Sequence, residues 1–404
     1  MDGSMSKKKI TLFLLVIYLT FISLGLPDSV LGTAWPVMYD EFHVSSGAAG
    51  LIAMVVAICT VISSLKTVAL VQRFGTARLV IFSVLLTAVG LLGFGVTQQY
   101  LFFVLFAIPL GLGAGAIDTA LNDYVALHFK AHHMNWLHGF WGIGATLGPM
   151  IMGTVLLRQW SWRSGYFLLG GLQLIVVIVL LFSLPLWRMP SKTAKAKQSN
   201  EAAGMSIRET LRIPGVWYSV LSFIFYVGIE ASMGLWGSSY LILVKGTTVG
   251  HAGFIVSAFY ASLTIGRMVS GFLTFRFSNR FILYMSEVLL LVGVFLIFLF
   301  EGSLGIIGFA LTGLGSAAIF PTMLHETPTR FGVTHSGQVM GVQIGLAYIG
   351  TAGLPFLLGL LGETFSMAIF PPMLMTFGVI LLVATIRIEK ITENKEKRGK
   401  NDNY

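Results

Sequence analysis

The sequence has little charge and almost no cysteine. Only 11% of its 404 residues are charged, whereas an ordinary soluble domain has about 25%. The single cysteine, Cys59, cannot form a disulfide within the chain or build a cysteine metal or redox motif. No G-x-x-x-x-G-K-[ST] segment is present, which argues against direct use of ATP. A water-soluble protein of one or two domains is therefore nearly excluded.

Apolar runs fill the chain instead. Hydrophobic residues make up 55% of the sequence, and a membrane span needs about 20 mostly apolar residues. Twelve such runs are centred near residues 22, 56, 88, 113, 145, 175, 229, 262, 291, 315, 348 and 377. The run that begins at Ile10 is too long for a signal peptide and is interpreted as the first span. The sequence thus predicts an all-α integral membrane protein with twelve transmembrane helices.

Positive charge is distributed unevenly between the loops. If the N-terminus is cytoplasmic, 23 Lys and Arg residues fall on the cytoplasmic side, and only Arg158, Arg163 and Lys245 fall on the other. This asymmetry predicts that both termini are cytoplasmic, in a multi-pass protein of the cell membrane. It also accounts for the net charge of +9 without a nucleic-acid partner.

The two halves of the sequence resemble each other. Residues 111–119 (GLGAGAIDT) recur as residues 313–321 (GLGSAAIFP), and residues 70–75 (LVQRFG) recur as residues 273–278 (LTFRFS). The predicted organisation is a six-helix half over 1–187, a cytoplasmic linker over 188–213, a second half over 214–390 and a cytoplasmic tail over 391–404. The glycines of residues 111–115 lie within a membrane run, so they are interpreted as close helix packing and not as a dinucleotide-binding loop.

Three carboxylates lie near mid-depth in predicted spans: Asp28, Asp118 and Glu230. Placing an Asp at the centre of a membrane helix costs about 2.5–3.5 kcal/mol, so these residues are candidates for ion coupling. Asp118 and Asn122 are four residues apart and share one helix face. Because removal from water favours the neutral form of a carboxyl group, Asp118 is suited to exchanging a proton. Packing hydrogen bonds are the alternative interpretation for all three.

Asp28 follows a helix-breaking residue. Pro27 removes one backbone donor, so nearby carbonyl oxygens are expected to be free to join the Asp28 carboxylate around a cation. Sodium therefore remains a possible coupling ion beside the proton. No organic cofactor and no resident metal are expected, because His128, His132 and His133 are accounted for by a cytoplasmic loop. Glu287 and three other glutamates near span ends are interpreted as solvated.

The loop after the second predicted span resembles a family signature. The major facilitator superfamily carries G-x-L-A-D-R-x-G-R-R there, and residues 68–77 (VALVQRFGTA) keep Leu70, Arg73 and Gly75. The second copy, residues 271–280 (GFLTFRFSNR), keeps four further positions, including Arg276. Both copies lack the acid of the signature. The resemblance implies a transporter that works by alternating access, with spans 1, 4, 7 and 10 around a central cavity.

Two further segments are similar to one branch of that superfamily. Residues 118–122 (DTALN) and 225–230 (FYVGIE) resemble segments of the fucose, galactose and glucose symporters and of sodium-dependent glucose transporters. Candidate substrate-binding residues are Asn122, Tyr226, Trp236, Gln343, Trp141 and Trp35. Candidate gating or conformational residues are Arg73, Gly75, Arg267, Arg276, Gly148, Pro149 and Pro355. Helix interruptions are expected at Gly25 and Pro27, at Gly148 and Pro149, at Pro321 and at Pro355.

These observations favour a secondary transporter and not an enzyme. The favoured function is uptake of a small polar solute such as a sugar, driven by a proton or sodium gradient, with one chain acting as a monomer. The alternative is proton-coupled export of drugs or amphiphiles, because residues 144–153 (GATLGPMIMG) approximate a glycine-rich antiporter segment. An intramembrane aspartyl protease is disfavoured, since Gly115 and Asp118 do not form the G-x-G-D motif.

Overall fold

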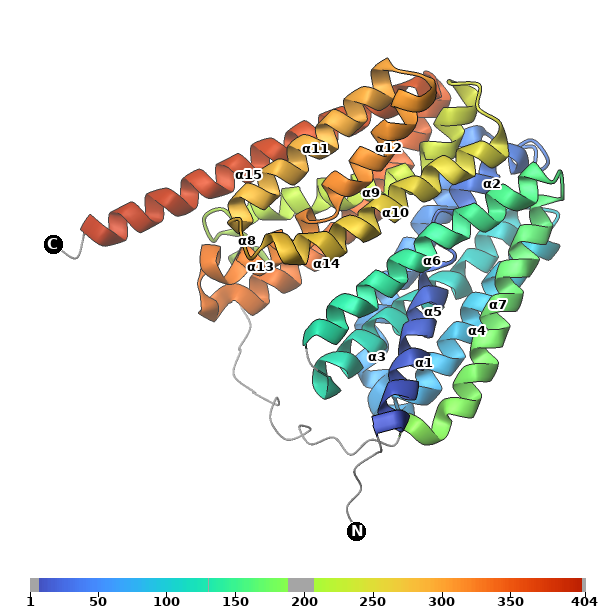
Figure 1. Ribbon diagram of the computed structural model, residues 1–404, viewed down its shortest axis with the longest axis horizontal. Coiled ribbons are helices and arrows are strands. Elements are labelled where there is room, and N and C mark those ends of the chain that lie inside the picture. The colour runs from blue at the N-terminus through green and yellow to red at the C-terminus, as the bar shows by residue number, and fades with distance from the viewer. Residues whose placement is uncertain (1–6, 130, 188–206, 402–404) are drawn as a thin grey trace, which may run out of the picture. The chain divides into compact units, whose positions relative to one another are not determined.

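The structure is a computed structural model that describes residues 7–129, 131–187 and 207–401. Residues 188–206 of the predicted linker, the side chain of His132 and the last three residues lie outside this description. The described residues fold into two compact units (Figure 1). The first unit comprises residues up to 198 and residues 234–261, and the second comprises residues 199–233 and 262–404. The helices α9 and α10 therefore contribute to both units.

The first unit is built mainly from seven α-helices and two short 3-10 helices. Their bounds are α1 (Lys7–Gly25), α2 (Val30–Met38), η1 (Ser46–Ala48), α3 (Ala49–Phe74), α4 (Thr76–Val96), α5 (Tyr100–His128), α6 (Ala131–Leu157), α7 (Trp162–Ser183) and η2 (Leu184–Trp187). Within it, α5 packs against both α3 and α4, and α1 packs against α6. The ends of α9 and α10 complete the unit.

The second unit contains the remaining helices. Their bounds are α8 (Ile207–Leu211), α9 (Val216–Leu243), α10 (Val249–Leu273), α11 (Asn279–Leu299), α12 (Gly302–Ser316), α13 (Ile319–Phe331), α14 (Val333–Thr364), η3 (Met367–Ile369) and α15 (Phe370–Asn401). Within it, α11 packs against α12 and α15. The last helix continues through most of the predicted tail, since α15 ends at Asn401.

Twelve helical segments in the described residues are long and apolar enough to cross a membrane. Each contains one of the twelve span centres that the sequence predicts, so the all-α transmembrane architecture is confirmed. The first span joins α1 to α2 across a break, and the tenth joins α12 to α13 across another. In contrast, α6 continues past Pro149 and α14 continues past Pro355, so the interruptions expected there do not end the helices.

Glycines of the repeated segment pack against neighbouring backbones. The α-carbon of Gly113 in α5 lies against Ser83 O and the Thr87 backbone nitrogen of α4. In the second unit, Gly315 of α12 makes the same contact with Ser286 O and the backbone nitrogen of Leu290 in α11. Any larger residue would push these helices apart, which confirms the packing interpretation of the segment. The matching contacts also support two pseudo-symmetric halves.

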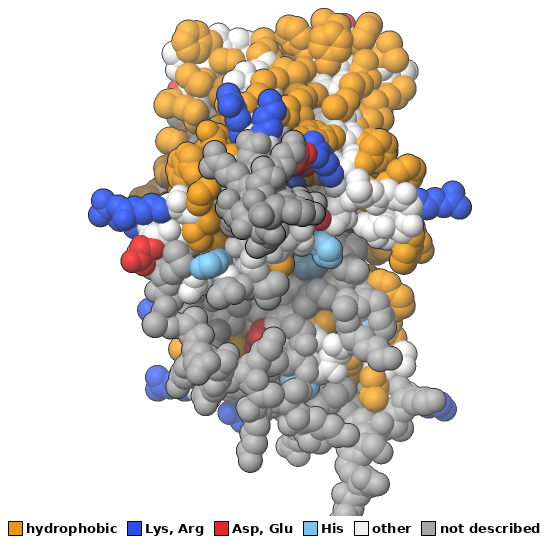
Figure 2. Space-filling model, turned by 90° about the vertical axis from the view of Figure 1, so that its left-hand side faces the viewer, with side chains coloured by type: hydrophobic (Ala, Val, Ile, Leu, Met, Phe, Trp, Pro, Cys, Tyr) orange, Lys and Arg blue, Asp and Glu red, His pale blue; other side chains and the backbone are white. Residues whose placement is uncertain are grey.

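The surface has the composition expected for contact with lipid. Large apolar side chains such as Phe82, Leu85 and Val89 on α4 are exposed, while Ser83 and Thr87 on the same helix are buried. In the view of Figure 2, apolar side chains cover much of the described surface that faces the viewer, with Lys and Arg at separate places. Ser83 and Thr87 thus face neighbouring helices, whereas the exposed face of α4 carries large apolar side chains, as expected where lipid replaces water.

Candidate functional site

An acid and an amide form a pair on α5. The Asn122 side-chain nitrogen donates to Asp118 Oδ1 at 2.8 Å and to the Asp118 carbonyl at 3.0 Å. The helical spacing predicts this contact, because residues four apart lie on one face. Within the part of the chain that the structure describes, no Lys or Arg forms an ion pair with Asp118. The carboxylate is therefore balanced by an amide donor and not by an opposite charge.

The partner amide still has bonding capacity. Asn122 Oδ1 is buried and has no hydrogen-bond partner among the described residues. An amide oxygen removed from water without a donor is unfavourable. A hydroxyl group of a bound solute is the kind of donor that would satisfy it. The pair thus combines an acid that can take up a proton with an acceptor that can bind a polar solute.

A second acidic site joins α9 to α10. Tyr226 OH donates to Glu230 Oε2 at 2.5 Å, and Arg267 Nη2 lies 3.3 Å from the same carboxylate oxygen. Arg267 also donates to the Tyr226 hydroxyl at 3.3 Å. The side chains of Glu230 and Arg267 are only 17% and 21% exposed, so water screens their attraction weakly. Three residues that the sequence assigned to coupling, substrate binding and gating thus form one triad.

The break between α1 and α2 follows from Pro27 and its neighbours. The Asp28 amide bonds to Gly25 O at 3.0 Å and the Val30 amide to Pro27 O at 3.3 Å, so hydrogen bonding tightens to a three-residue spacing. Ser29 has φ of 63°, a left-handed conformation that is unusual for a serine. The half-buried Asp28 therefore sits on an irregular turn within the first span.

The carbonyl that Pro27 deprives of its helical donor is not free. Gln173 Nε2 of α7 donates to Ser23 O at 2.6 Å, and Gln173 is completely buried. The Ser23 carbonyl is therefore not left free as expected, because a buried carbonyl needs a donor and the Gln173 amide supplies it. Sequence reasoning missed Gln173. The available signal was a lone amide inside the apolar run of α7.

Two residues predicted to bind substrate are engaged by the protein. Trp35 is 1% exposed and its indole nitrogen donates to Ser46 O at 2.6 Å. Gln343 is fully buried, where its amide nitrogen donates to Ser219 Oγ at 2.6 Å and its oxygen accepts from Thr327 Oγ1 at 3.1 Å. Both side chains therefore use polar atoms in hydrogen bonds within the protein.

The two other tryptophans of the predicted set belong to the first unit. Trp236 is fully buried on α9. Trp141 on α6 makes an edge contact with the ring of Tyr260, at 6.4 Å between ring centroids. The hydroxyl of Tyr260 lies against the α-carbon of Gly234, as does the hydroxyl of Ser29. Tyr260, the ring neighbour of Trp141, thus contacts the same glycine as Ser29 of the irregular turn.

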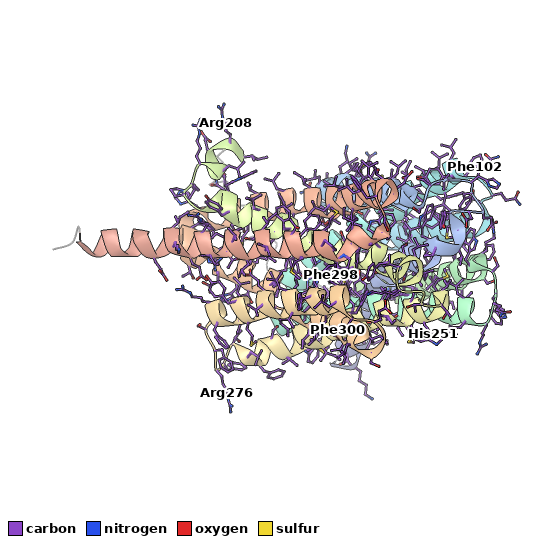
Figure 3. All side chains as sticks on the ribbon, turned by 90° about the horizontal axis from the view of Figure 1, so that it is seen from above. Phe102, Arg208, His251, Arg276, Phe298 and Phe300 are labelled. Atoms are coloured by element: carbon purple, nitrogen blue, oxygen red, sulfur yellow. The ribbon has the colours of Figure 1, made fainter. Side chains whose placement is uncertain are left out.

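The predicted gating residues occupy several environments. Gly75 ends α3 with φ of 82°, a conformation that glycine adopts without strain. The Arg73 guanidinium lies over the Phe74 ring at 5.3 Å from its centroid, and no described carboxylate forms an ion pair with it. Arg276 is exposed and points away from the ribbon (Figure 3). Neither arginine is therefore held in a charge pair in the described residues.

The glycine and proline residues of α6 and α14 complete that set. The α-carbon of Gly148 lies against Leu26 O and Val30 of the first span, so α6 approaches the helix break closely. The Pro149 carbonyl lies against Gly253 of α10. Pro355 lies within α14. Gly148 therefore places α6 beside the segment that carries Asp28, and Pro149 places it beside α10.

Comparisons with known proteins agree with this architecture. A family model described as Major Facilitator Superfamily matches residues 17–355 and 245–402. The chain belongs to the major facilitator superfamily. It is therefore a membrane transporter of small molecules and not an enzyme. Bypass of stop codon protein 6 from Saccharomyces cerevisiae is 25% identical to it over 388 residues, which cover 87% of this chain and 77% of the yeast protein.

Two further similarities cover nearly the whole chain. The glucose/mannose transporter GlcP from Bacillus subtilis is 21% identical over 379 residues, 92% of this chain and 94% of that protein. Among solved structures, a bacterial homologue of the human lysosomal transporter Spinster, in an inward-facing and unoccupied conformation, has a TM-score of 0.79. That match covers 96% of this chain and 98% of the other at 14% identity, so it shows the shared fold alone.

Proposed function

We propose that this transporter moves a small polar solute by alternating access, with a proton as the driving ion. A sugar is the favoured candidate for that solute. The observation that carries the proposal is the Asp118–Asn122 pair. It offers a carboxylate without a cationic partner in the described residues and a buried amide oxygen without a donor. Uptake of a proton by the acid and of a hydroxyl by the amide are both chemically favourable there.

Two further points support this proposal. The similarity to the glucose/mannose transporter GlcP spans nearly the full length of both chains. In addition, Asp118 Oδ1 already accepts a hydrogen bond from Asn122 and no described cation pairs with this carboxyl group, so a proton is the simplest ion to neutralise it. We therefore favour the proton over sodium. We expect one chain to suffice, with both termini in the cytoplasm of a cell whose plasma membrane contains it.

Uptake into proteoliposomes tests the proposal. A panel of labelled sugars is supplied under an imposed proton gradient and, separately, under a sodium gradient of equal size. Sugar accumulation that follows the proton gradient supports the proposal. Gradient-dependent transport of cationic dyes with no sugar uptake would instead support the alternative, proton-coupled export of amphiphiles.

The matched variants are Asp118→Asn and Asp123→Asn. Asp123 is exposed on the same helix one residue beyond the pair, so its substitution removes a charge without touching the site. We expect Asp118→Asn to lose accumulation against a gradient and Asp123→Asn to keep it. Equal accumulation by both variants would refute the role of Asp118.

A further inference from the structure

Polar side chains form a ladder between α11 and α15 of the second unit. These two helices lie side by side (Figure 1). Residues spaced by three or four positions share a helix face. Three such residues stand on each helix: Arg280, Tyr284 and Glu287 on α11, and Thr385, Glu389 and Glu393 on α15. The spacing therefore places the three residues of each helix on one face, and together they form the ladder.

The outer end of the ladder is an ion-pair cluster. Arg280 Nε lies 2.5 Å from Glu389 Oε2, and Arg280 Nη1 also binds Glu393. Tyr284 OH donates to Glu389 Oε2 at 2.8 Å. Arg280 and Glu393 are about half exposed, with side-chain values of 55% and 45%. This end is therefore open to water, on the side that the distribution of basic residues predicts to be cytoplasmic.

The inner end of the ladder is buried. Glu287 is 1% exposed, and its Oε1 accepts a hydrogen bond from Thr385 Oγ1 at 2.6 Å. The interpretation of Glu287 as a solvated residue is therefore wrong. The prediction used the position of Glu287 along its span, but that position does not show which helix packs over the side chain. In the structure, α15 packs over it. Glu389, one turn beyond Thr385 on α15, is also buried.

The buried acids outnumber the buried cations at this end. Arg330 of α13 is 7% exposed, and its Nη2 lies 3.6 Å from Glu389 Oε1. Glu287 interacts electrostatically with both Arg330 and Glu389 but forms no ion pair within the described residues. Glu326 of α13 is a further acid near Arg330, and α12 carries no charged residue. One buried guanidinium thus faces two buried carboxyl groups.

Two carboxylate oxygens of this group lack hydrogen-bond donors. Glu287 Oε2 and Glu389 Oε1 are both buried without a hydrogen-bond partner among the described residues. A buried anionic oxygen without a donor is strongly unfavourable. A proton on Glu287 removes the unbalanced charge and turns Oε2 into a donor. Glu389 Oε1, one turn beyond Thr385 on α15, is an acceptor without a hydrogen-bond donor in the described residues.

We propose that Glu287 is a proton-binding site, separate from Asp118, that holds α15 against α11 when it is occupied. The water-exposed pair of Arg280 and Glu393 is its connection to solution. Loss of the proton leaves a buried Glu287 carboxylate that has no ion pair of its own in the described residues and lies near Glu389, which already binds Arg280 and Arg330. We therefore expect α15 to loosen from α11 as the pH on that side rises. This role goes beyond the transport function and does not depend on it.

Infrared spectroscopy of the full-length protein in lipid tests proton binding directly. The measurement uses an Asp118→Asn background, so that Asp118 contributes no signal. We expect an absorption of a protonated carboxyl group that disappears in Glu287→Gln. Thr385→Val removes the hydrogen bond to Oε1 and should move the frequency of this absorption. The exposed Glu363→Gln is the control and should change neither.

Thermal unfolding in detergent is the second measurement. The folded protein holds a proton that the unfolded chain releases, so raising the pH should destabilise the wild type. The unfolding constant should rise by up to about tenfold per pH unit relative to that of Glu287→Gln. Parallel pH profiles of the two proteins, or an infrared absorption unchanged by Glu287→Gln, would each overturn the proposal. Neither result depends on which solute is transported.

Discussion

The acidic sites on α5 and on α9 contain the same chemical group in opposite electrical settings. Asp118 is bonded to the amide of Asn122 and pairs with no cation in the described residues, whereas Glu230 is bonded to Arg267 and Tyr226. A guanidinium balances the charge of a neighbouring carboxylate, whereas a neutral amide only donates a hydrogen bond to it. Depth in the membrane therefore does not decide a carboxylate's role, because its first partner does. This contrast supports the proposal that Asp118 carries the coupled proton, and it predicts that Glu230 stays in its ion pair with Arg267.

The largest expected effect breaks the comparison at Asp118. Asp118→Asn keeps the side chain's size but cannot exchange a proton, so accumulation of solute against its gradient should be abolished. Equilibrium exchange of solute across the membrane should persist, because the amide of Asn122 is retained. Radiolabelled uptake and counterflow in proteoliposomes measure the two activities separately. Loss of exchange together with accumulation would mean that Asp118 binds the solute itself.

The next effect breaks the ion pair on the other side of the comparison. Arg267→Gln leaves Glu230 without its cation and should lower stability by about 2 kcal/mol, less than for a fully buried pair because both side chains are partly exposed. Adding Glu230→Gln removes the unpaired charge and should restore most of that loss. Thermal melting of the single and double variants measures the coupling. Additive losses would show that the two residues act independently.

A smaller effect extends the comparison to Asp28, the third acid, by testing the hydrogen bond that stabilises the helix break beside it. Gln173→Leu leaves Ser23 O without its donor and should destabilise the protein by about 1.5 kcal/mol. Pro27→Ala supplies a backbone donor to the same carbonyl, so the double variant should lose less than the sum. The isosteric Thr20→Val is the control, since the Thr20 hydroxyl donates to Val16 O of its own helix. A double variant with fully additive losses would contradict this account of the break.

The smallest effect concerns the neutral member of the triad. Tyr226→Phe removes one hydrogen bond to Glu230 but leaves Arg267 in place, so the expected loss of stability is about 1 kcal/mol. Denaturation curves of wild type and variant measure it. If Tyr226→Phe costs as much as Arg267→Gln, the hydroxyl and not the guanidinium is the main partner of Glu230.

The span pattern was predictable because it depends on composition along the chain, and each apolar run is long enough to identify a helix. The break at Pro27 was also predictable, since proline acts on its own helix. Pairings between distant residues were not. Glu230 and Arg267 were both singled out, yet nothing in their spacing of 37 residues indicated an ion pair. Glu287 was misjudged for the same reason, because Thr385 lies 98 residues further along.

Gln173 illustrates a different limit of sequence reasoning. The loss of a donor at Pro27 was anticipated, but the residue that replaces that donor lies 150 positions away from Ser23. A single amide in an apolar run hardly changes the mean hydropathy of the span, so hydropathy does not reveal its role. Only the folded arrangement shows that its donor is required at one carbonyl oxygen.

The final helix has a mechanical consequence. With 32 residues at about 1.5 Å per residue, α15 is about 48 Å long, whereas the hydrocarbon core of a bilayer is about 30 Å thick. Roughly 18 Å of an unbroken rod therefore extends beyond the hydrocarbon. Because a rod transmits tilt along its length, a spin label or fluorophore on its outer turns would amplify small rotations of the buried part into measurable displacements.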